Sequence, residues 1–238
     1  FQSKQGPAAA SCATGPAFEG AAIRHGMQAT SGAVDSVRFN RSTGCLEHTV
    51  IQRGPGRPKP PAGICGSGVI TAVAELLRAG ILSKSGSFNA GCGSPCLRPG
   101  ESGVLEFVIV PAEPRRNRRA IALTQADVRA VQLAKGALRT GIDLLCRENG
   151  MPRPSRILLA GAFGSFIDRR DALTLGMFPE MEPDAIEVVG NAAGAGAVLA
   201  LLREECFTQA REMARAARVL DLAAHPDFQN TFISALSF

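Results

Sequence analysis

The chain has 238 residues, a net charge of +5 and about 45% hydrophobic residues, as expected for a globular protein of one large domain or two small ones. No apolar run approaches the roughly 20 residues of a membrane-spanning helix, and no secretory leader opens the sequence, so we expect a cytoplasmic protein. Trp and Tyr are absent, which counts against a protein that stacks nucleic acid bases. Phe1 is not an initiator Met, and we expect a fragment of a longer chain.

Seven cysteines are scattered along the sequence, and we expect them to be reduced and largely buried. Only Cys92 and Cys96 lie close together, and no second pair or histidine stands at zinc-site spacing. The sequence therefore predicts no metal site, although a ligand role for this pair stays open as an alternative.

The first glycine-containing stretch covers residues 9–23. Pro16 suits the first turn of a helix, and Thr14 or Gly15 before it suits the cap. Such a helix start would offer free backbone N–H groups to an anion. Glu19 lies about one turn further on, where it either complements the helix dipole from solvent or takes part in a site.

Alternating apolar residues predict a hairpin over 33–52, and a loop rich in proline, glycine and basic residues follows. A second glycine-rich stretch, 63–68, opens a helix that ends at Gly80. This stretch matches neither the P-loop nor the dinucleotide-binding pattern. Its glycines serve either close helix packing or an anion site.

Residues 81–103 are expected to be irregular, and strands are expected over 104–110 and 120–123. The dense basic run 115–119 lies between these strands. It is either a solvated hairpin tip or a contact for an acidic partner or nucleic acid.

A long helix follows, because Thr124 and Asp127 form a capping-box pattern at its start and Asn149-Gly150 suits its end. Its expected apolar stripe comprises Val128, Val131, Leu133, Ala134, Leu138, Ile142 and Leu145. Gln132, Lys135 and Arg139 share a polar face of this helix, which is solvated unless a ligand lies there.

Residues 157–160 are an unbroken apolar run, which predicts a strand buried on both faces, and Gly161-Ala162-Phe163-Gly164 follows at once. Ligands of open α/β sheets lie beyond the carboxyl ends of the strands, so this turn is a candidate nucleotide loop. Plain packing of small residues is the alternative.

The C-terminal third continues the alternation of strands and helices, which predicts α/β layers. The helix that begins at 190–197 contains so many small residues that we expect it to lie very close to another backbone. The other expected elements are a helix over 168–176, a strand over 186–189, a basic helix over 207–218, a strand over 219–222 and a terminal helix over 226–238. The side chains expected to face inward from that last helix are Phe228, Phe232, Ile233 and Leu236.

Several glycine-containing stretches follow one another in a specific order: 11–20, 63–68, 159–164 and 189–196, with 123–125 and 131–135 between them. In this order they resemble the C-terminal actin-like ATPase domain of the reductive activators of corrinoid proteins. Residues 12–19 are also similar to the activators of acyl-CoA dehydratases and benzoyl-CoA reductases. The resemblance covers nearly the whole chain.

The resemblance implies an α/β fold, an actin-like, ribonuclease H-like lobe of the ASKHA type with a mixed sheet flanked by helices. This lobe would span residues 1–238, with hairpin or loop insertions at 33–62 and 81–123. It also implies ATP-driven electron transfer, in which a [2Fe–2S] ferredoxin module outside this chain supplies the electron. The electron would return the Co(II) corrinoid of a methyltransferase system to Co(I), with nucleotide driving a hinge between two lobes.

The resemblance also implies roles for single residues. The adenosine loop would comprise Gly161, Ala162, Phe163 and Gly164, with Gln132 and Lys135 beside the adenine or ribose. Gly15 would face the phosphates, and Glu19 is the catalytic candidate that would position water or Mg²⁺. The residues expected to let the two lobes pivot are Gly190, Asn191, Gly194 and Gly196.

The sequence departs from the superfamily in one respect, because the Asp-Gly-Thr-type phosphate loops and the ferredoxin cysteines are absent. We expect them upstream of Phe1, so the chain alone would hydrolyse ATP weakly or not at all. The expected partners are ATP and a corrinoid protein, with neither nucleic acid nor membrane, and a homodimer stays open.

Two other functions are alternatives for this sequence. One is a partner-docking or dimerisation module with a degenerate nucleotide site, which would use the basic tip 115–119 on an acidic corrinoid protein. The other is a sugar-kinase-like phosphotransferase, which lacks support because no Asp in a glycine-rich context is present to act as base.

Overall fold

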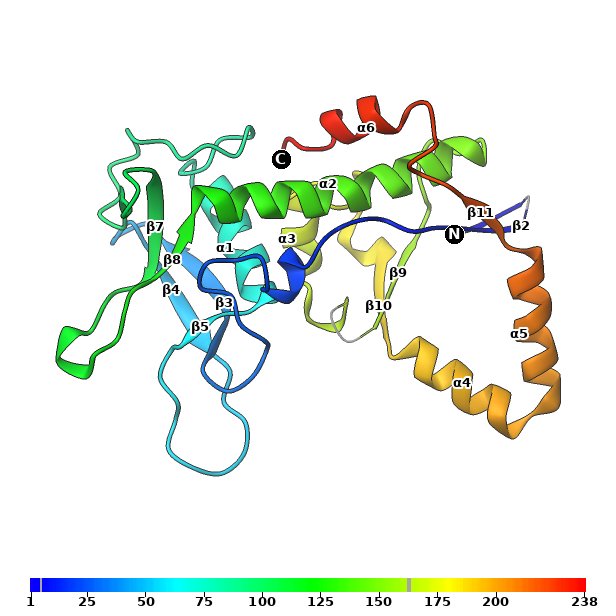
Figure 1. The fold of residues 1–238 in the computed structure, drawn as a ribbon, viewed down its shortest axis with the longest axis horizontal. Coiled ribbons are helices and arrows are strands. Elements are labelled where there is room, and N and C mark those ends of the chain that lie inside the picture. Colours follow the sequence, from blue (N-terminus) through cyan, green and yellow to red (C-terminus); the bar gives the residue numbers. More distant parts are fainter. Residues whose placement is uncertain (5, 162–163) are drawn as a thin grey trace.

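The computed structural model describes residues 1–4, 6–161 and 164–238 and shows helices packed against small β-sheets (Figure 1). The long helix α2 runs across the molecule, with the sheets of residues 33–124 near its N-terminal end and strands β2 and β11 near its C-terminal end. None of the described helices combines the length and apolar content needed to cross a membrane. The described helices are α1 (Gly66–Arg78), α2 (Gln125–Glu148), α3 (Arg169–Thr174), α4 (Ala192–Leu202), α5 (Glu204–Ala216) and α6 (Phe228–Ser234).

The described strands form four sheets, with the orders β1-β2-β11, β4-β3-β5, β6-β7-β8 and β10-β9. The pairs β2–β11, β3–β5 and β9–β10 are parallel and the others are antiparallel, so the predicted α/β class with mixed pairing is confirmed. The strands are β1 (Gln2–Ser3), β2 (Gly6–Ala10), β3 (Ala33–Asn40), β4 (Cys45–Val50), β5 (Gly63–Ile64), β6 (Leu97–Pro99), β7 (Leu105–Val110), β8 (Ile121–Thr124), β9 (Ile157–Ala160), β10 (Ile186–Gly190) and β11 (Arg218–Leu220).

The hairpin expected over 33–52 is formed by β3 and β4, and it belongs to the body of the domain. Strand β3 also pairs in parallel with β5, and α1 packs across β3. This packing requires the second glycine-rich stretch, because a Cβ at Gly68 would collide with the backbone carbonyl of Val34. Close packing is therefore the role that the structure gives to glycine at this helix start.

Helix α2 begins with the predicted capping box. The Thr124 hydroxyl accepts a hydrogen bond from the Asp127 N–H at 3.2 Å, and the Asp127 carboxylate accepts one from the Thr124 N–H at 2.8 Å. Val128 and Val131 are fully buried as expected. Leu133, which we expected in the same apolar stripe, is half exposed, because two residues beyond Val131 correspond to about 200° around the helix.

The helix expected from Pro16 is not an α-helix. Residues Ala17–Glu19 form one turn of 3-10 helix, which ends at Gly20 with φ at +82°. The chain then folds back tightly, since a Cβ on Gly26 would overlap the Gly20 carbonyl. A single turn lacks the aligned peptide dipoles of a longer helix, so the helix start on which the expected anion site depended is not formed.

The terminal helix is shorter than expected, and one side chain that we expected to face inward is exposed. Phe228 and Phe232 stack with ring centroids 5.8 Å apart, and α6 packs on α2. Gly136 of α2 allows this approach, because a Cβ there would lie 3.2 Å from the Leu236 side chain. Ile233 is 58% exposed, contrary to expectation, because a helix of two turns covers α2 with one face only.

The cysteines are not all reduced in the structure. Cys45 at the start of β4 and Cys96 just before β6 form a disulfide with a sequence separation of 51. The contact of β4 with β7, the partner of β6, brings the two residues together. Cys92, four positions before Cys96, is free as expected, and the expectation of a reduced thiol is wrong for Cys45 and Cys96.

Candidate functional site

The carboxyl ends of β9 and β10 lie side by side. The two strands are parallel, with Gly190 opposite Ala160, and the Gly161 N–H donates to the Gly190 carbonyl at 2.8 Å. The first residues of the expected adenosine loop and of the expected hinge helix therefore meet at one end of this strand pair. This end is where ligands of parallel α/β sheets bind.

The backbone at Gly161 is built for close approach. Its φ is +93°, a conformation that side-chain-bearing residues rarely adopt, and no described atom lies within 4 Å of a Cβ built there. Gly164 turns the chain back, since a Cβ there would lie 3.2 Å from the Leu159 Cβ. Ala162 and Phe163 lie outside the described residues, so their expected part in the loop is left as a prediction.

The segment after this loop is held by a helix cap. The Asp168 carboxylate accepts hydrogen bonds from the N–H groups of Arg170 and Asp171 at 2.8 and 2.9 Å, and so starts α3. On the other strand, the Asn191 side chain accepts from the Gly194 N–H at 3.0 Å and starts α4. Both chain segments therefore leave the strand ends through capped helices.

Helix α4 does not pack as its composition led us to expect. No described residue of α4 is buried, and no described atom lies within 4 Å of a Cβ built on Gly196. Its large apolar side chains are 49–86% exposed, and these are Val198, Leu199, Leu201 and Leu202. The close backbone partner that we predicted is not supplied by the described residues of this chain.

Gln132 and Lys135 are buried on the side of α2 that faces α6. The Gln132 amide donates to the carbonyls of Ser85 and Leu236 at 3.1 and 3.0 Å. The Lys135 ammonium donates to the Ser237 carbonyl and lies 5.4 Å from the centre of the Phe238 ring. Figure 1 shows α6 on one side of α2 and the ends of β9 and β10 on the other, so these side chains are not brought to Gly161.

The burial of Lys135 has a measurable consequence for stability. Burial, together with the smaller effect of the nearby Arg139 charge, lowers the pKa of Lys135 from its ordinary 10.5 to about 8. Between these two pH values the unfolded chain binds a proton that the folded chain has lost, so stability rises with pH there.

We expect Lys135→Met to remove a rise of up to about 3 kcal/mol in the free energy of unfolding between pH 8 and 10.5. Urea unfolding of both proteins across this range measures the difference. Lys84→Met, at an exposed lysine, is the matched control and should keep the wild-type pH profile. Parallel pH profiles for Lys135→Met and wild type would contradict the assignment.

Gly15 and Glu19 lie on the short turn that contacts both α1 and α2. Gly15 has φ at +62° and is exposed, with no described atom near a built Cβ. Glu19 is exposed, and its side chain has no hydrogen bond or ion pair among the described residues, while its backbone N–H donates to the Pro16 carbonyl at 3.2 Å. The structure thus places Glu19 free in solvent, where this chain gives it no substrate-positioning partner.

A groove of about 880 Å³ lies beside α3 and was not predicted. In its wall, Arg78 of α1 contacts Asp171 at 2.7 Å and Glu75 at 2.9 Å, and so ties α3 to α1. Burial raises the pKa of Asp171, and its ion pair with Arg78 opposes this rise. Asp168 and Arg170 line the same groove. The ion pairs of Arg78 therefore hold α3, the helix that follows the glycine loop 161–164. No local sequence pattern links Arg78 with Asp171.

The residues present do not fit Mg²⁺ or an iron–sulfur cluster. Across the part of the chain that the structure describes, no three His, Cys, Asp or Glu side chains are grouped for metal binding. The free cysteines are Cys12, Cys65, Cys92, Cys146 and Cys206, which are far apart in sequence. At Gly161, beside two adjacent strand ends, no described atom lies within 4 Å of a built Cβ.

Comparison with known proteins gives consistent matches over the whole chain. A family model described as the C-terminal domain of RACo, the ASKHA domain, matches residues 1–238. The corrinoid activation enzyme RamQ of Eubacterium limosum is 36% identical over 96% of this chain and 39% of its own length. A Methanosarcina barkeri reductase of the Co(II) methylated amine-specific corrinoid protein is 27% identical over 96% of this chain and 42% of its own.

A solved structure is also similar. The reductive activator for corrinoid,iron-sulfur protein superimposes with a TM-score of 0.84 at 33% identity, covering 97% of this chain and 36% of its own length. The chain thus spans about two fifths of the length of these relatives.

Proposed function

The chain belongs to the family of the C-terminal ASKHA domain of RACo, and from this premise we propose that it is one lobe of an ATP-dependent reductive activator of a corrinoid protein. The complete activator transfers one electron from a [2Fe–2S] module outside this chain to a Co(II) corrinoid, which becomes Co(I). The setting is a cytoplasmic methyltransferase system. The chain contributes a nucleotide half-site and a hinge.

The meeting of β9 and β10 carries this proposal. Gly161 and Gly190 are hydrogen-bonded neighbours at the carboxyl ends of two parallel strands, and no described atom lies within 4 Å of a Cβ built on Gly161. A nucleoside that lies against Gly161 meets backbone there, with no described side chain within 4 Å of a Cβ built on that residue. The phosphates and Mg²⁺ are held by residues outside this chain, because the described residues offer no grouped carboxylates for the metal.

The exposed surface of α4 supports a two-lobe arrangement. Val198 and Leu201 are apolar and exposed, and Val189 at the end of β10 is 41% exposed. A helix that is apolar all round is normally buried, so α4 packs against the part of the activator that this chain does not include. Gly190 and the α4 glycines then let the lobes pivot when nucleotide binds.

The pivot is the step that couples nucleotide to electron transfer. A ligand shifts a conformational equilibrium only by the difference in its affinity for the two conformers. Nucleotide held between the lobes binds the closed conformer through both half-sites and the open conformer through one. Closure of the lobes around ATP is therefore the proposed source of the conformational energy.

Calorimetric titration with ATP tests the half-site. We expect the chain alone to bind ATP weakly, with little or no hydrolysis, and the longer activator that includes the upstream lobe to bind and hydrolyse it. The physical reason is that only one side of the nucleotide is contacted here. Robust turnover by residues 1–238 alone would overturn this proposal.

A further inference from the structure

Two segments of the chain concentrate its positive charge. The first basic prong is the loop 52–61 between β4 and β5, and the second basic prong is 111–120, the tip of the β7–β8 hairpin. Together they contain seven of the 26 basic residues and one of the 21 acidic residues. The remaining 19 basic and 20 acidic residues nearly cancel, so the net charge of the protein resides in the two prongs.

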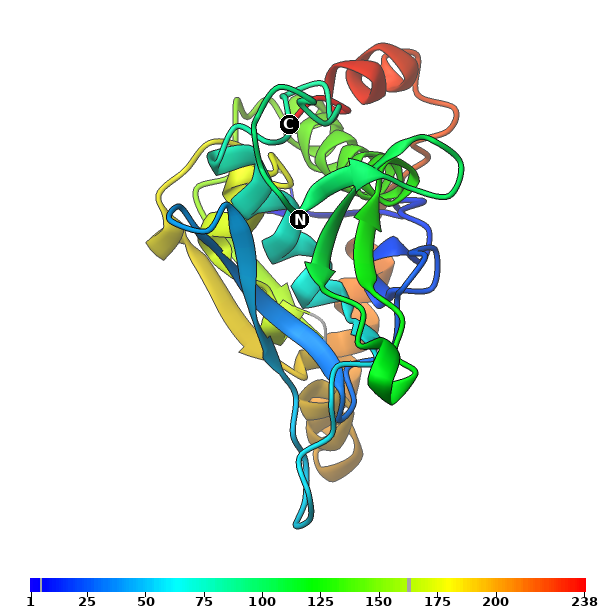
Figure 2. The same cartoon turned by 90° about the vertical axis from the view of Figure 1, so that its left-hand side faces the viewer.

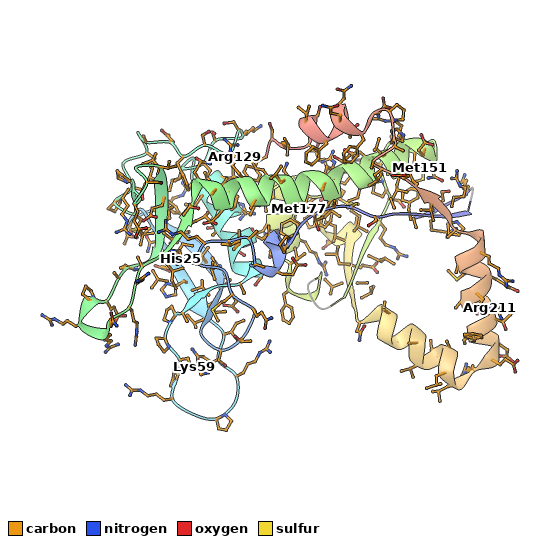
Figure 3. The ribbon with its side chains drawn as sticks, viewed as in Figure 1. His25, Lys59, Arg129, Met151, Met177 and Arg211 are labelled. Atoms are coloured by element: carbon orange, nitrogen blue, oxygen red, sulfur yellow. A yellow bond between two sulfur atoms is a disulfide. The ribbon has the colours of Figure 1, made fainter. Side chains whose placement is uncertain are left out.

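Both prongs extend from the sheets formed by the first half of the chain, the first pointing downward in Figure 1 and the second to the lower left. Figure 1 and Figure 2 show the two loops projecting below the sheets of the first half of the chain. Strands β4 and β7, from which they emerge, are in contact. Figure 3 places Lys59 on the first prong, well away from the body of the protein.

Each prong is closed at its base, so neither is a loose tail. The Gln52 side chain donates to the Lys59 carbonyl at 2.8 Å and accepts from the Lys59 N–H at 2.9 Å. In the second prong the backbone N–H groups of Glu113 and Arg118 donate to each other's carbonyls at 3.0 and 3.2 Å. Prolines further restrict both segments, and they are Pro55, Pro58, Pro60, Pro61, Pro111 and Pro114.

The prong charges are mostly uncompensated. Glu113 pairs with Arg116 at 3.4 Å and with Arg118 at 3.3 Å. Arg115 and Arg119 are exposed and have no ion pair with any described residue, and the first prong contains no acidic residue. Like charges held close together raise the energy of the free protein, and an acidic partner removes this cost on binding.

The composition of the prongs favours a protein partner over nucleic acid. Neither segment contains an aromatic residue, so neither offers a surface for stacking bases. Acidic side chains on a folded protein match separated, pre-ordered cationic groups without such stacking.

We propose that the two basic prongs are the docking surface for an acidic patch of the corrinoid protein, an inference that rests on the proposed function. The partner's patch spans both prongs, and long-range attraction accelerates its approach. The contact then orients the corrinoid protein relative to the hinged lobe. This surface lies apart from the glycine loop, so docking and nucleotide binding can be measured separately.

Charge reversal on each prong tests the proposal in the full-length activator. The variants are Arg57→Glu with Lys59→Glu on the first prong, and Arg115→Glu with Arg119→Glu on the second. The control is Arg41→Glu with Lys84→Glu, two exposed basic residues elsewhere that give the same change in net charge. The probes are the corrinoid,iron-sulfur protein and the methylated amine-specific corrinoid protein, with a short DNA duplex as the nucleic acid comparison.

Each prong variant is expected to weaken binding of at least one corrinoid protein by about tenfold or more and to make its affinity less dependent on salt. The control should stay within about twofold of the wild type. The proposal is overturned if prong variants bind like the wild type, if affinity is insensitive to salt, if only DNA binding is lost, or if neither corrinoid protein binds. The affinity of the same variants for ATP should equal that of the wild type. If the wild type itself does not bind ATP, the proposed function fails, and this result is distinct from a failure of the docking proposal.

Discussion

Gly161→Val is expected to abolish nucleotide binding by the full-length activator, with a loss in affinity of at least about 100-fold, or roughly 2.8 kcal/mol. A valine side chain would occupy the open space beside the strand end, where we place the nucleoside. No described atom lies within 4 Å of that position, so the cost of the substitution to the fold comes from the positive φ of the backbone rather than from a described neighbour. Calorimetry with ATP measures the loss.

The chain offers a matched control in Gly150→Val. Gly150 also has a positive φ, at +64°, and it also has no described atom within 4 Å of a built Cβ. Both substitutions therefore carry a similar backbone penalty of roughly 1–2 kcal/mol in stability. Gly150 follows the end of α2, away from β9 and β10, so its variant should bind ATP like the wild type. Equal affinities for the two variants would rule out a nucleotide site at Gly161.

Loss of the disulfide is expected to be the largest effect on stability. Cys96→Ser should lower the free energy of unfolding by about 4 kcal/mol, because Cys45 and Cys96 close a loop with a sequence separation of 51. Urea unfolding with and without a thiol reductant measures this difference. Reductant should bring the wild type to the stability of the variant and leave the variant unchanged.

Cys92→Ser is the control for this experiment. Cys92 lies four positions before Cys96 but is free, so its substitution should preserve the response to reductant. If wild type and Cys96→Ser unfold at the same urea concentration without reductant, the disulfide does not form in solution.

The sequence predicts well those helices and strands whose characteristic residue pattern lies within the element itself. The capping box at Thr124 and the apolar period after it place α2, and the unbroken apolar run at 157–160 places β9. The expected burial of β9 on both faces is wrong, because among the described strands β9 pairs only with β10 and Leu158 is 51% exposed. The hairpin over 33–52 follows from alternation between turn residues. In each case the pattern that forms the element lies within the element.

The features that sequence misses depend on contacts across the fold. Cys45 and Cys96 meet only because two sheets pack together, and the carbonyl of Ser237 reaches Lys135 from 102 residues away. The polar face of α2 predicted a solvated or ligand-binding surface at Lys135, but the end of the chain covers it. Local spacing contains no information about such partners.

The glycine-rich stretches 63–68 and 161–164 have different surroundings in the structure, as Gly68 and Gly161 show. A packing or a ligand role was open for 63–68 and for 161–164 on sequence alone. The structure assigns Gly68 to packing, because the Val34 backbone fills the space a Cβ would need. Gly161 differs because no described atom lies within 4 Å of a Cβ built there, and this contrast with Gly68 is visible only in the coordinates.

The most direct test of the whole account is the formation of Co(I) from a Co(II) corrinoid protein, followed spectroscopically with the full-length activator and reduced ferredoxin module. We predict that Co(I) accumulates with ATP in the wild type and in Gly150→Val, and that it fails to accumulate in Gly161→Val or without ATP. Equal Co(I) formation by Gly161→Val and wild type, or by the wild type without ATP, would contradict the account.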